Sequence, residues 1–191
     1  MRIGTLGFCA LGFALGSGSL PAAANVMWSS DATLSKVTLS VPYLLVSKTN
    51  ATLPVESATI VTSDASTTPL TIDLRFASAS LSTGDAKRDA ELRSDRFFDT
   101  AQYPTIEFAS EQIVETNAGT FSVKGTLAMH GTARPLLLEG RSFAERRDDD
   151  GRRRIRYEAT GSFRRSDFGI SYARGILGDD VSLVIVIEAV N

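Results

Sequence analysis

The charged side chains of two short stretches are the strongest candidates for chemistry in this chain, because they stand close to aromatic residues. Residues 89–99 are Asp-Ala-Glu-Leu-Arg-Ser-Asp-Arg-Phe-Phe-Asp, and residues 163–170 are Phe-Arg-Arg-Ser-Asp-Phe-Gly-Ile. Opposite charges from two segments can hold those segments together, or they can bind the polar head group of a ligand. We expect the structural role, in which Arg165 pairs with a carboxylate of the first stretch. Binding of a head group remains the alternative.

The chain offers little for acid-base or metal chemistry. Its single histidine, His130, alternates in phase with Lys124 and Thr126, which predicts a position outside a barrel of strands. No Gly-x-Ser-x-Gly segment presents a nucleophilic serine, and the histidine and cysteine ligands are too few for zinc. Residues 148–151, Asp-Asp-Asp-Gly, lack the alternating ligands of a calcium loop, and no phosphate loop occurs. We therefore expect no catalysis, no metal and no resident cofactor.

Residues 1–24 have the pattern of a cleavable secretory signal. Arg2 precedes an apolar run of residues 3–15, and Ala22-Ala23-Ala24 supplies small residues for cleavage. The run is too short to span a bilayer, which takes about 20 apolar residues. We expect a single mature domain, residues 25–191, that begins at Asn25 and is periplasmic or secreted. Cys9 would be removed with the signal, which leaves no disulfide.

The charge balance argues against nucleic acid as a partner. The whole chain carries a net charge of -2, and loss of Arg2, the sole charge in residues 1–24, makes it -3. The only basic cluster, in residues 146–154, is largely offset by the acids around it, so we expect a solvated hairpin face. A transient contact with anionic lipid head groups is the alternative for this cluster.

Most of the mature chain alternates between apolar and polar residues with a period of two, which indicates half-buried antiparallel strands. The pattern is clear in residues 37–41, 70–76, 121–129 and 155–163. Asp149-Asp150-Gly151 predicts a hairpin turn, and a second strand ends at His130-Gly131. Residues 181–190 are apolar on both faces except at Ser182 and Glu188, so we expect the helical segment or another element to cover this strand outside.

Residues 85–99 break the strand pattern and predict one or two short helices. They hold several good helix formers, no β-branched residue, and Asp85, or Thr83 just before them, as an N-terminal cap. A second helix starting at Ser94 would bring Phe97 and Phe98 onto the barrel. The strands and this insertion predict an all-β fold with a short helical insertion.

Several segments together resemble the YceI-like, polyisoprenoid-binding family. They are the two charged stretches, Tyr-Pro-Thr-Ile-Glu-Phe at 103–108, Val-Lys-Gly-Thr-Leu at 123–127 and Gly-Thr-Ala-Arg-Pro at 131–135. The resemblance covers the chain from about residue 70 to its end. It implies a lipocalin-like antiparallel β-barrel of about eight strands that encloses a long apolar ligand. Residues 31–60 depart from the pattern, with Leu34 in place of a histidine, and we expect the mouth of the barrel to differ there.

The resemblance implies an exported, non-catalytic carrier or storage protein for an isoprenoid or a similar lipid, such as a quinone. The alternative is a structural or interaction module of the envelope whose barrel is filled by its own side chains. A homodimer is left open. The inward strand residues and the motif phenylalanines are the expected lining of the tunnel: Leu39, Leu74, Phe76, Phe98, Phe108, Phe121, Val123, Leu127, Tyr157, Phe163, Phe168 and Ile185. The small Ala159 and Gly161 predict empty space in the middle of one wall.

Overall fold

The computed structural model describes residues 24–44 and 47–191. The predicted signal peptide therefore lies, except for Ala24, outside the described residues. No helix in the described part is long and apolar enough to cross a membrane.

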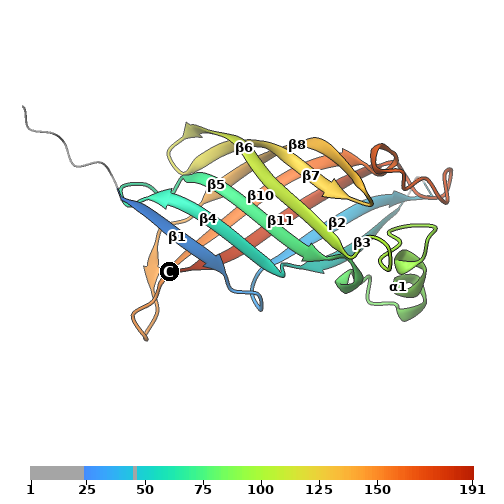
Figure 1. Cartoon of the computed structure of the whole chain (residues 1–191), viewed down its shortest axis with the longest axis horizontal. Helices are drawn as coiled ribbons and strands as arrows, with labels where there is room; N and C mark the ends of the chain where they lie inside the picture. The colour runs from blue at the N-terminus through green and yellow to red at the C-terminus, as the bar shows by residue number, and fades with distance from the viewer. Residues whose placement is uncertain (1–23, 45–46) are drawn as a thin grey trace, which may run out of the picture.

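The alternation correctly predicted antiparallel strands, and eight of them close into a barrel, as the resemblance to the YceI-like family implied. Around the wall the order is β11, β1, β4, β5, β6, β7, β8 and β10, and β10 pairs again with β11 (Figure 1). Two further strands, β2 and β3, extend the wall from β11, and the two-residue β9 pairs with β10. The strands are β1 (Asn25–Ser30), β2 (Lys36–Tyr43), β3 (Ser47–Pro54), β4 (Ser57–Ser63), β5 (Pro69–Ala77), β6 (Thr105–Asn117), β7 (Thr120–Met129), β8 (Thr132–Ser142), β9 (Arg146–Arg147), β10 (Arg153–Arg164) and β11 (Asp180–Val190).

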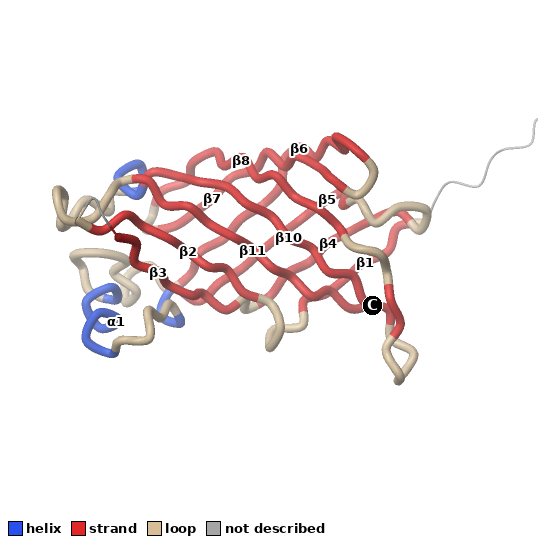
Figure 2. Tube along the Cα trace, turned by 180° about the vertical axis from the view of Figure 1, so that it is seen from behind, coloured by secondary structure: helices blue, strands red, loops and turns tan. Residues whose placement is uncertain are grey.

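At two places in the wall, one strand has two different neighbours along its length on the same side. The last residues of β11 pair with β1, while its first half pairs with β2. In the same way β4 pairs with β5, while β3 reaches the segment after β5 only through the bridge between Thr52 and Ser82. The wall is therefore weakly paired beside β3. The helical insertion lies at this end of the barrel, opposite the C-terminus (Figure 2).

The helical insertion is shorter than predicted. Helix α1 spans Ala86–Arg93, and the carboxylate of Asp85 caps it by accepting hydrogen bonds from the backbone N–H groups of Lys87 and Arg88. The predicted second helix at Ser94 is wrong, because residues 94–99 form turns. These turns still place Phe97 in a buried position and pack the half-buried Phe98 against the core. Two 3₁₀ turns, Ser78–Ser80 and Arg165–Phe168, complete the helical elements.

Two turns behave as the sequence indicates, with one difference. Asp149-Asp150-Gly151 lies in the turn between β9 and β10, with Gly151 at a φ of 83°. His130 and Gly131 join β7 to β8 and both have positive φ, 50° and 70°, which fits a tight hairpin. His130 is not a freely exposed side chain, however. It is half-buried, its ring lies 4.7 Å from that of Tyr103, and its Nδ1 is 2.9 Å from the carbonyl oxygen of Phe168.

Two expectations about strand faces are wrong. Leu70, predicted to point inward, is 53% exposed, because an extra residue in β5 opposite Val61 and Thr62 shifts the alternation. The helical segment does not cover β11. Val184 is exposed, and Glu188 is buried instead by arginines of β9 and β10.

Candidate functional site

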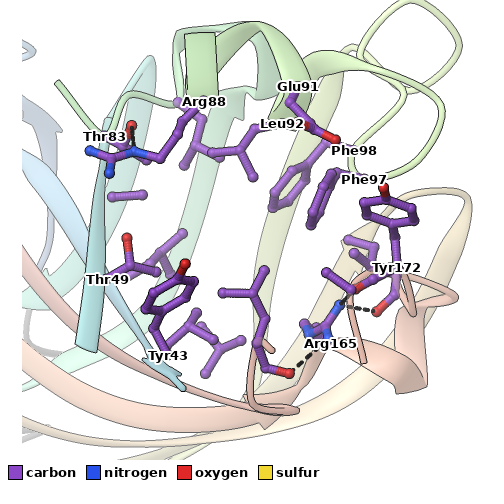
Figure 3. A pocket seen from close by; sticks show the side chains of 18 of the residues that line it. Tyr43, Thr49, Thr83, Arg88, Glu91, Leu92, Phe97, Phe98, Arg165 and Tyr172 are labelled. Carbon is purple, nitrogen blue, oxygen red and sulfur yellow. Dashed lines mark hydrogen bonds between the residues drawn. The ribbon is translucent and has the colours of Figure 1, made fainter. Parts of the chain in front are cut away.

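The main cavity opens at the α1 end of the barrel and has a volume of about 580 Å³. Its walls come from β2, β3, the segment 81–98, the loop 170–177 and the start of β11. Figure 3 shows Phe97 and Phe98 on one side of this space and Arg88, Thr49 and Tyr43 on the other. This cavity is the candidate functional site.

A second, much smaller space of about 50 Å³ lies deeper in the barrel, and its lining is entirely apolar. Leu39, Phe98, Met129 and Phe163 line both spaces and therefore separate them. The interior below these four side chains is largely filled by the protein itself.

Eight of the twelve predicted lining residues border one of these spaces. Leu39, Phe98 and Phe163 line both, and the smaller space alone takes Leu74, Phe76, Phe108, Leu127 and Ile185. The other four predicted residues line neither space. They are Phe121, Val123, Tyr157 and Phe168.

The four residues that do not line a cavity have packing roles. The rings of Phe121 and Tyr157 meet edge to face with centroids 6.4 Å apart, among the fully enclosed side chains at the end opposite α1. The Tyr157 hydroxyl donates a hydrogen bond to the Thr67 carbonyl, and burial raises the pKa of Tyr157. Phe168 packs edge to face on Phe163 at 5.5 Å, so it supports the cavity floor from behind.

Most residues at the mouth of the cavity were not predicted from the sequence. Val41 and Tyr43 continue the alternation of Leu39 along β2, so that signal was available. Ile170, Tyr172 and the rest of the loop 170–177 also line the cavity, but a loop has no periodicity from which its inward residues can be predicted.

Arg165 holds this loop in place. Its side chain is buried and donates four hydrogen bonds to backbone carbonyls, to Tyr172 at 2.7 Å, Gly178 at 2.9 Å, Leu177 at 3.1 Å and Ile170 at 3.2 Å. The prediction that Arg165 pairs with a carboxylate of the helical segment is therefore wrong. Burial lowers the pKa of the guanidinium. Arg165 is a structural residue of the cavity wall.

Asp89 holds the start of the helical segment in place by hydrogen bonds, as Arg165 holds the loop 170–177. Its carboxylate accepts hydrogen bonds of 2.7 Å from the Thr83 N–H, the Thr83 hydroxyl and the Ser82 hydroxyl. These bonds, the Thr83 N–H first, lower the pKa of Asp89 to about 2. Arg93 in turn donates to the carbonyls of Ala79 and Leu81. Arg165 thus orders the loop 170–177, while Asp89 and Arg93 order the segment that precedes and forms α1.

Aromatic contacts connect the helical segment to the loop 170–177. The rings of Phe97 and Tyr172 meet edge to face at 5.3 Å. The Arg96 guanidinium lies 5.2 Å from the centroid of the Tyr172 ring, and its Nη1 is 3.6 Å from a carboxylate oxygen of Glu91. The first charged stretch therefore contacts the loop that follows the second one, through Arg96, Phe97 and Tyr172.

The space predicted beside Gly161 does not exist. A Cβ atom on Gly161 would lie 2.7 Å from Cδ2 of Leu138 and 2.8 Å from the Leu137 carbonyl oxygen. Neither Ala159 nor Gly161 borders a cavity. Atoms of the neighbouring strand β8 occupy the space that a larger side chain at position 161 would need.

The polar and charged lining residues stand mostly at the open side of the main cavity. Lys48 and Asn50 come from β3, and Thr83, Arg88 and Glu91 come from the helical segment. Within the described residues, no group of three or more histidine, cysteine, aspartate or glutamate side chains could hold a metal ion. The site is an apolar cavity with a polar edge.

Comparison with known proteins agrees with this geometry. A UPF0312 protein of Azotobacter vinelandii is 30% identical over 120 residues, and Protein YceI of Escherichia coli O157:H7 is 31% identical over 120 residues. In both cases the match covers 63% of this chain and 62% of the relative, so the chain spans less than two thirds of these relatives.

Solved structures show the same fold. BcnA of Burkholderia cenocepacia superimposes with a TM-score of 0.72 at 18% identity, covering 83% of this chain and 98% of that one. A polyisoprenoid binding domain from Saccharophagus degradans gives 0.57 at 18% identity, covering 85% and 97%. A family model described as the YceI-like domain matches residues 28–189. With the closed eight-strand barrel and its short helix, this match shows that the chain belongs to the YceI-like family.

Proposed function

We propose that the protein is an exported carrier or storage protein, without catalytic activity, that binds one long-chain apolar lipid in the cavity at the α1 end. An isoprenoid or the tail of a quinone is the expected class of ligand. Membership of the YceI-like family supports binding of a lipid, and the similar domain from Saccharophagus degradans is described as a polyisoprenoid binding domain.

The distribution of polarity in the cavity is the observation that carries this proposal. Its floor is made of Leu39, Phe98, Met129 and Phe163, and its charged residues lie at the edge, except for Arg165, whose guanidinium is bonded to backbone carbonyls. Burial of apolar surface contributes about 25 cal/mol per Å², so the floor would bind a hydrocarbon chain without specific polar contacts. The volume of 580 Å³ lies within the range of about 300–1,000 Å³ that is usual for ligand sites.

The cavity volume also limits the length of the bound chain. At about 30 Å³ per heavy atom, the volume that a water molecule occupies in the liquid, 580 Å³ holds roughly 20 heavy atoms. A longer isoprenoid would have to displace Phe98, Met129 or Phe163 to reach the small space below. We therefore expect either a chain of about this length or a floor that moves when a longer chain binds.

A packed interior favours a second candidate, a structural or interaction module of the envelope with no lipid ligand. The contacts at Gly161 and the small volume of the deeper space both show that the middle of the barrel is filled. This candidate gives no role to the apolar cavity at the α1 end, so we place it second.

Lipid recovery from a matched pair of variants separates the two candidates. Val41 lines the main cavity, whereas Val184 is exposed on the outer face of the barrel. The protein and its variants Val41→Trp and Val184→Trp would be purified from their own compartment and analysed by native mass spectrometry and lipid extraction. We expect lipid on the wild type and on Val184→Trp, and none on Val41→Trp. Absence of lipid from all three, with unchanged folding, would favour the structural module.

Export is tested by the N-terminus of the purified protein. Because Ala22-Ala23-Ala24 is the small-residue site after the apolar run, N-terminal sequencing should begin at Asn25. A membrane-bound protein that begins at residue 1 or 2 would instead indicate an anchored protein.

A further inference from the structure

The edge of the main cavity has two different sides. Tyr172 and Ile176, from the loop 170–177, are exposed apolar or aromatic residues on one side. Lys48 and Arg88 are exposed cations on the other. If the tail of a ligand lies on the apolar floor, its head group can therefore lie against either the apolar side or the cationic side of the edge.

The fold brings the cationic side together from two separate segments. Thr52 of β3 and Ser82 exchange backbone hydrogen bonds of 2.7 and 2.9 Å, which attach β3 to the segment that leads into α1. Lys48 precedes this bridge on β3, and Arg88 follows it in the first turns of α1. Both side chains line the same cavity.

The charged groups of Lys48 and Arg88, unlike those of the other charged lining residues Glu91 and Arg165, are not fully occupied by other groups of the protein. Neither Lys48 nor Arg88 has a carboxylate oxygen within 4.0 Å in the described part of the chain. By contrast, Arg165 is occupied by four carbonyls and Glu91 by Arg96. The nearby carboxylate of Asp85 accepts the backbone N–H groups of α1.

The Arg88 guanidinium is held at the cavity edge through a short chain of hydrogen bonds. Its Nε donates to the Thr83 hydroxyl oxygen at 3.3 Å, and that hydroxyl donates to the Asp89 carboxylate at 2.7 Å (Figure 3 shows the Arg88–Thr83 pair). No hydrogen bond within the described residues uses the two terminal nitrogens of Arg88. A guanidinium with free terminal nitrogens matches a carboxylate or a phosphate.

We propose that Lys48 and Arg88 form a head-group subsite, and that the ligand is a single-chain lipid with an anionic head, a carboxylate or a phosphate. The proposal rests on the proposed function, since it assumes that the tail occupies the cavity. Two unpaired cations beside an apolar cavity stabilise an anion more than a neutral quinone or alcohol, because only the anion adds an attraction between opposite charges to the hydrogen bonds. The side-chain amide of Asn50 also lines the cavity and can donate a hydrogen bond to the head.

A series of ligands with one tail and different heads tests the subsite. Oleate, oleyl phosphate and oleyl alcohol share a chain that fits the capacity of the cavity. Their dissociation constants would be measured by displacement of a neutral fluorescent lipid probe from the full mature protein. We expect both anions to bind at least about tenfold more tightly than the alcohol, the low end for hydrogen bonds to charged groups. The preference should shrink as salt is raised, because the site is exposed to solvent.

Matched variants assign the preference to the two cations. In Lys48→Gln combined with Arg88→Gln, affinity for the anions should fall to that of the alcohol, whose own affinity should not change. Lys87→Gln removes a charge from the neighbouring position, which does not line the cavity, and should leave the preference intact. Circular dichroism melting would confirm that each variant is folded.

The outcomes are distinguishable from failure of the proposed function. If no ligand of the series binds to wild type, the proposed lipid binding fails. If all three bind equally, or if the preference survives in the double variant, lipid binding stands and the head-group subsite is overturned. A preference for oleyl phosphate over oleate would identify phosphate as the head, and the reverse would identify carboxylate.

Discussion

The two ends of the barrel are built from similar residues but differ in what those residues contact. At the α1 end, Arg165 and Asp89 bind backbone groups of loops, and these loops surround a cavity. At the opposite end, arginines pair with carboxylates on the outer wall while the rings of Phe121 and Tyr157 fill the inside. At the α1 end the charged side chains thus order loops around a cavity, whereas at the far end they form ion pairs on the outside of a packed wall.

The network at the far end explains the basic cluster of residues 146–154. Arg154 lies between Asp31 and Asp148, and Glu188 is buried between Arg146 and Arg156. Arg153 pairs with Glu145 and stacks over the Trp28 ring, with its guanidinium carbon 4.9 Å from the centroid. These arginines are already paired with acids, so this face is a weaker candidate for anionic lipid head groups than the unpaired cations at the α1 end.

The largest effect should come from filling the packed middle that lies between the two ends. Gly161→Phe places a ring where even a Cβ atom would contact Leu138 and the Leu137 carbonyl. We expect the free energy of unfolding to fall by about 3 kcal/mol or more, as for strong overpacking. Thr160→Phe, on the exposed face of the same strand, is the control and should change it little. A Gly161→Phe protein that is stable but no longer binds lipid would contradict this expectation and would support the empty space beside Gly161 that was predicted from the sequence.

Removal of Arg165 should affect stability and ligand binding together. In Arg165→Ala the four carbonyls of residues 170, 172, 177 and 178 lose their donor. Unfolding in urea should show a loss of about 1–3 kcal/mol, and the affinity for oleate should also fall because the loop lines the cavity. Arg164→Ala removes only exposed ion pairs and should cost about 0.5 kcal/mol or less. Unchanged affinity in Arg165→Ala would show that the loop does not shape the site.

Weakening the network at the far end should affect stability alone. Glu188→Gln removes one charge from two ion pairs, but Arg146 and Arg156 remain partly exposed and can be solvated. We therefore expect a loss of only about 1 kcal/mol in urea unfolding, with unchanged affinity for oleate. A change in affinity would mean that the two ends are coupled.

The smallest expected effect concerns acid. The pKa of Asp89 is lowered from 3.8 to about 2 in the folded protein, so its ionised form stabilises the fold. That contribution is fully present above about pH 4 and is lost as the pH falls toward 2. Hydrogen exchange should therefore show the segment from Ser82 to α1 loosening as the pH falls through this range. Asp89→Asn should remove the part of the pH dependence that belongs to this residue, and an unchanged profile would contradict the assignment.

Local pattern was enough to predict the strands, the helix and the family. Alternation of apolar residues reports which face of a strand is buried, and this placed Leu39, Phe76 and Leu127 inside the barrel. A capping residue followed by helix formers located α1, because both signals act within a few residues. The order of the charged motifs indicated the YceI-like family, which the family model confirms.

Only the tertiary structure decided where the interior is empty and what the charged motifs bind. Gly161 suggested space, but the side chain of Leu138 from the neighbouring strand occupies it. Arg165 suggested an ion pair, but the carbonyls that it contacts belong to a loop whose path no periodicity reveals. The unpaired cations Lys48 and Arg88 meet at one cavity because β3 is bridged to Ser82. Such contacts join residues that are distant in sequence. The alternation predicts that a side chain points inward, but it does not predict which residue that side chain contacts across the barrel.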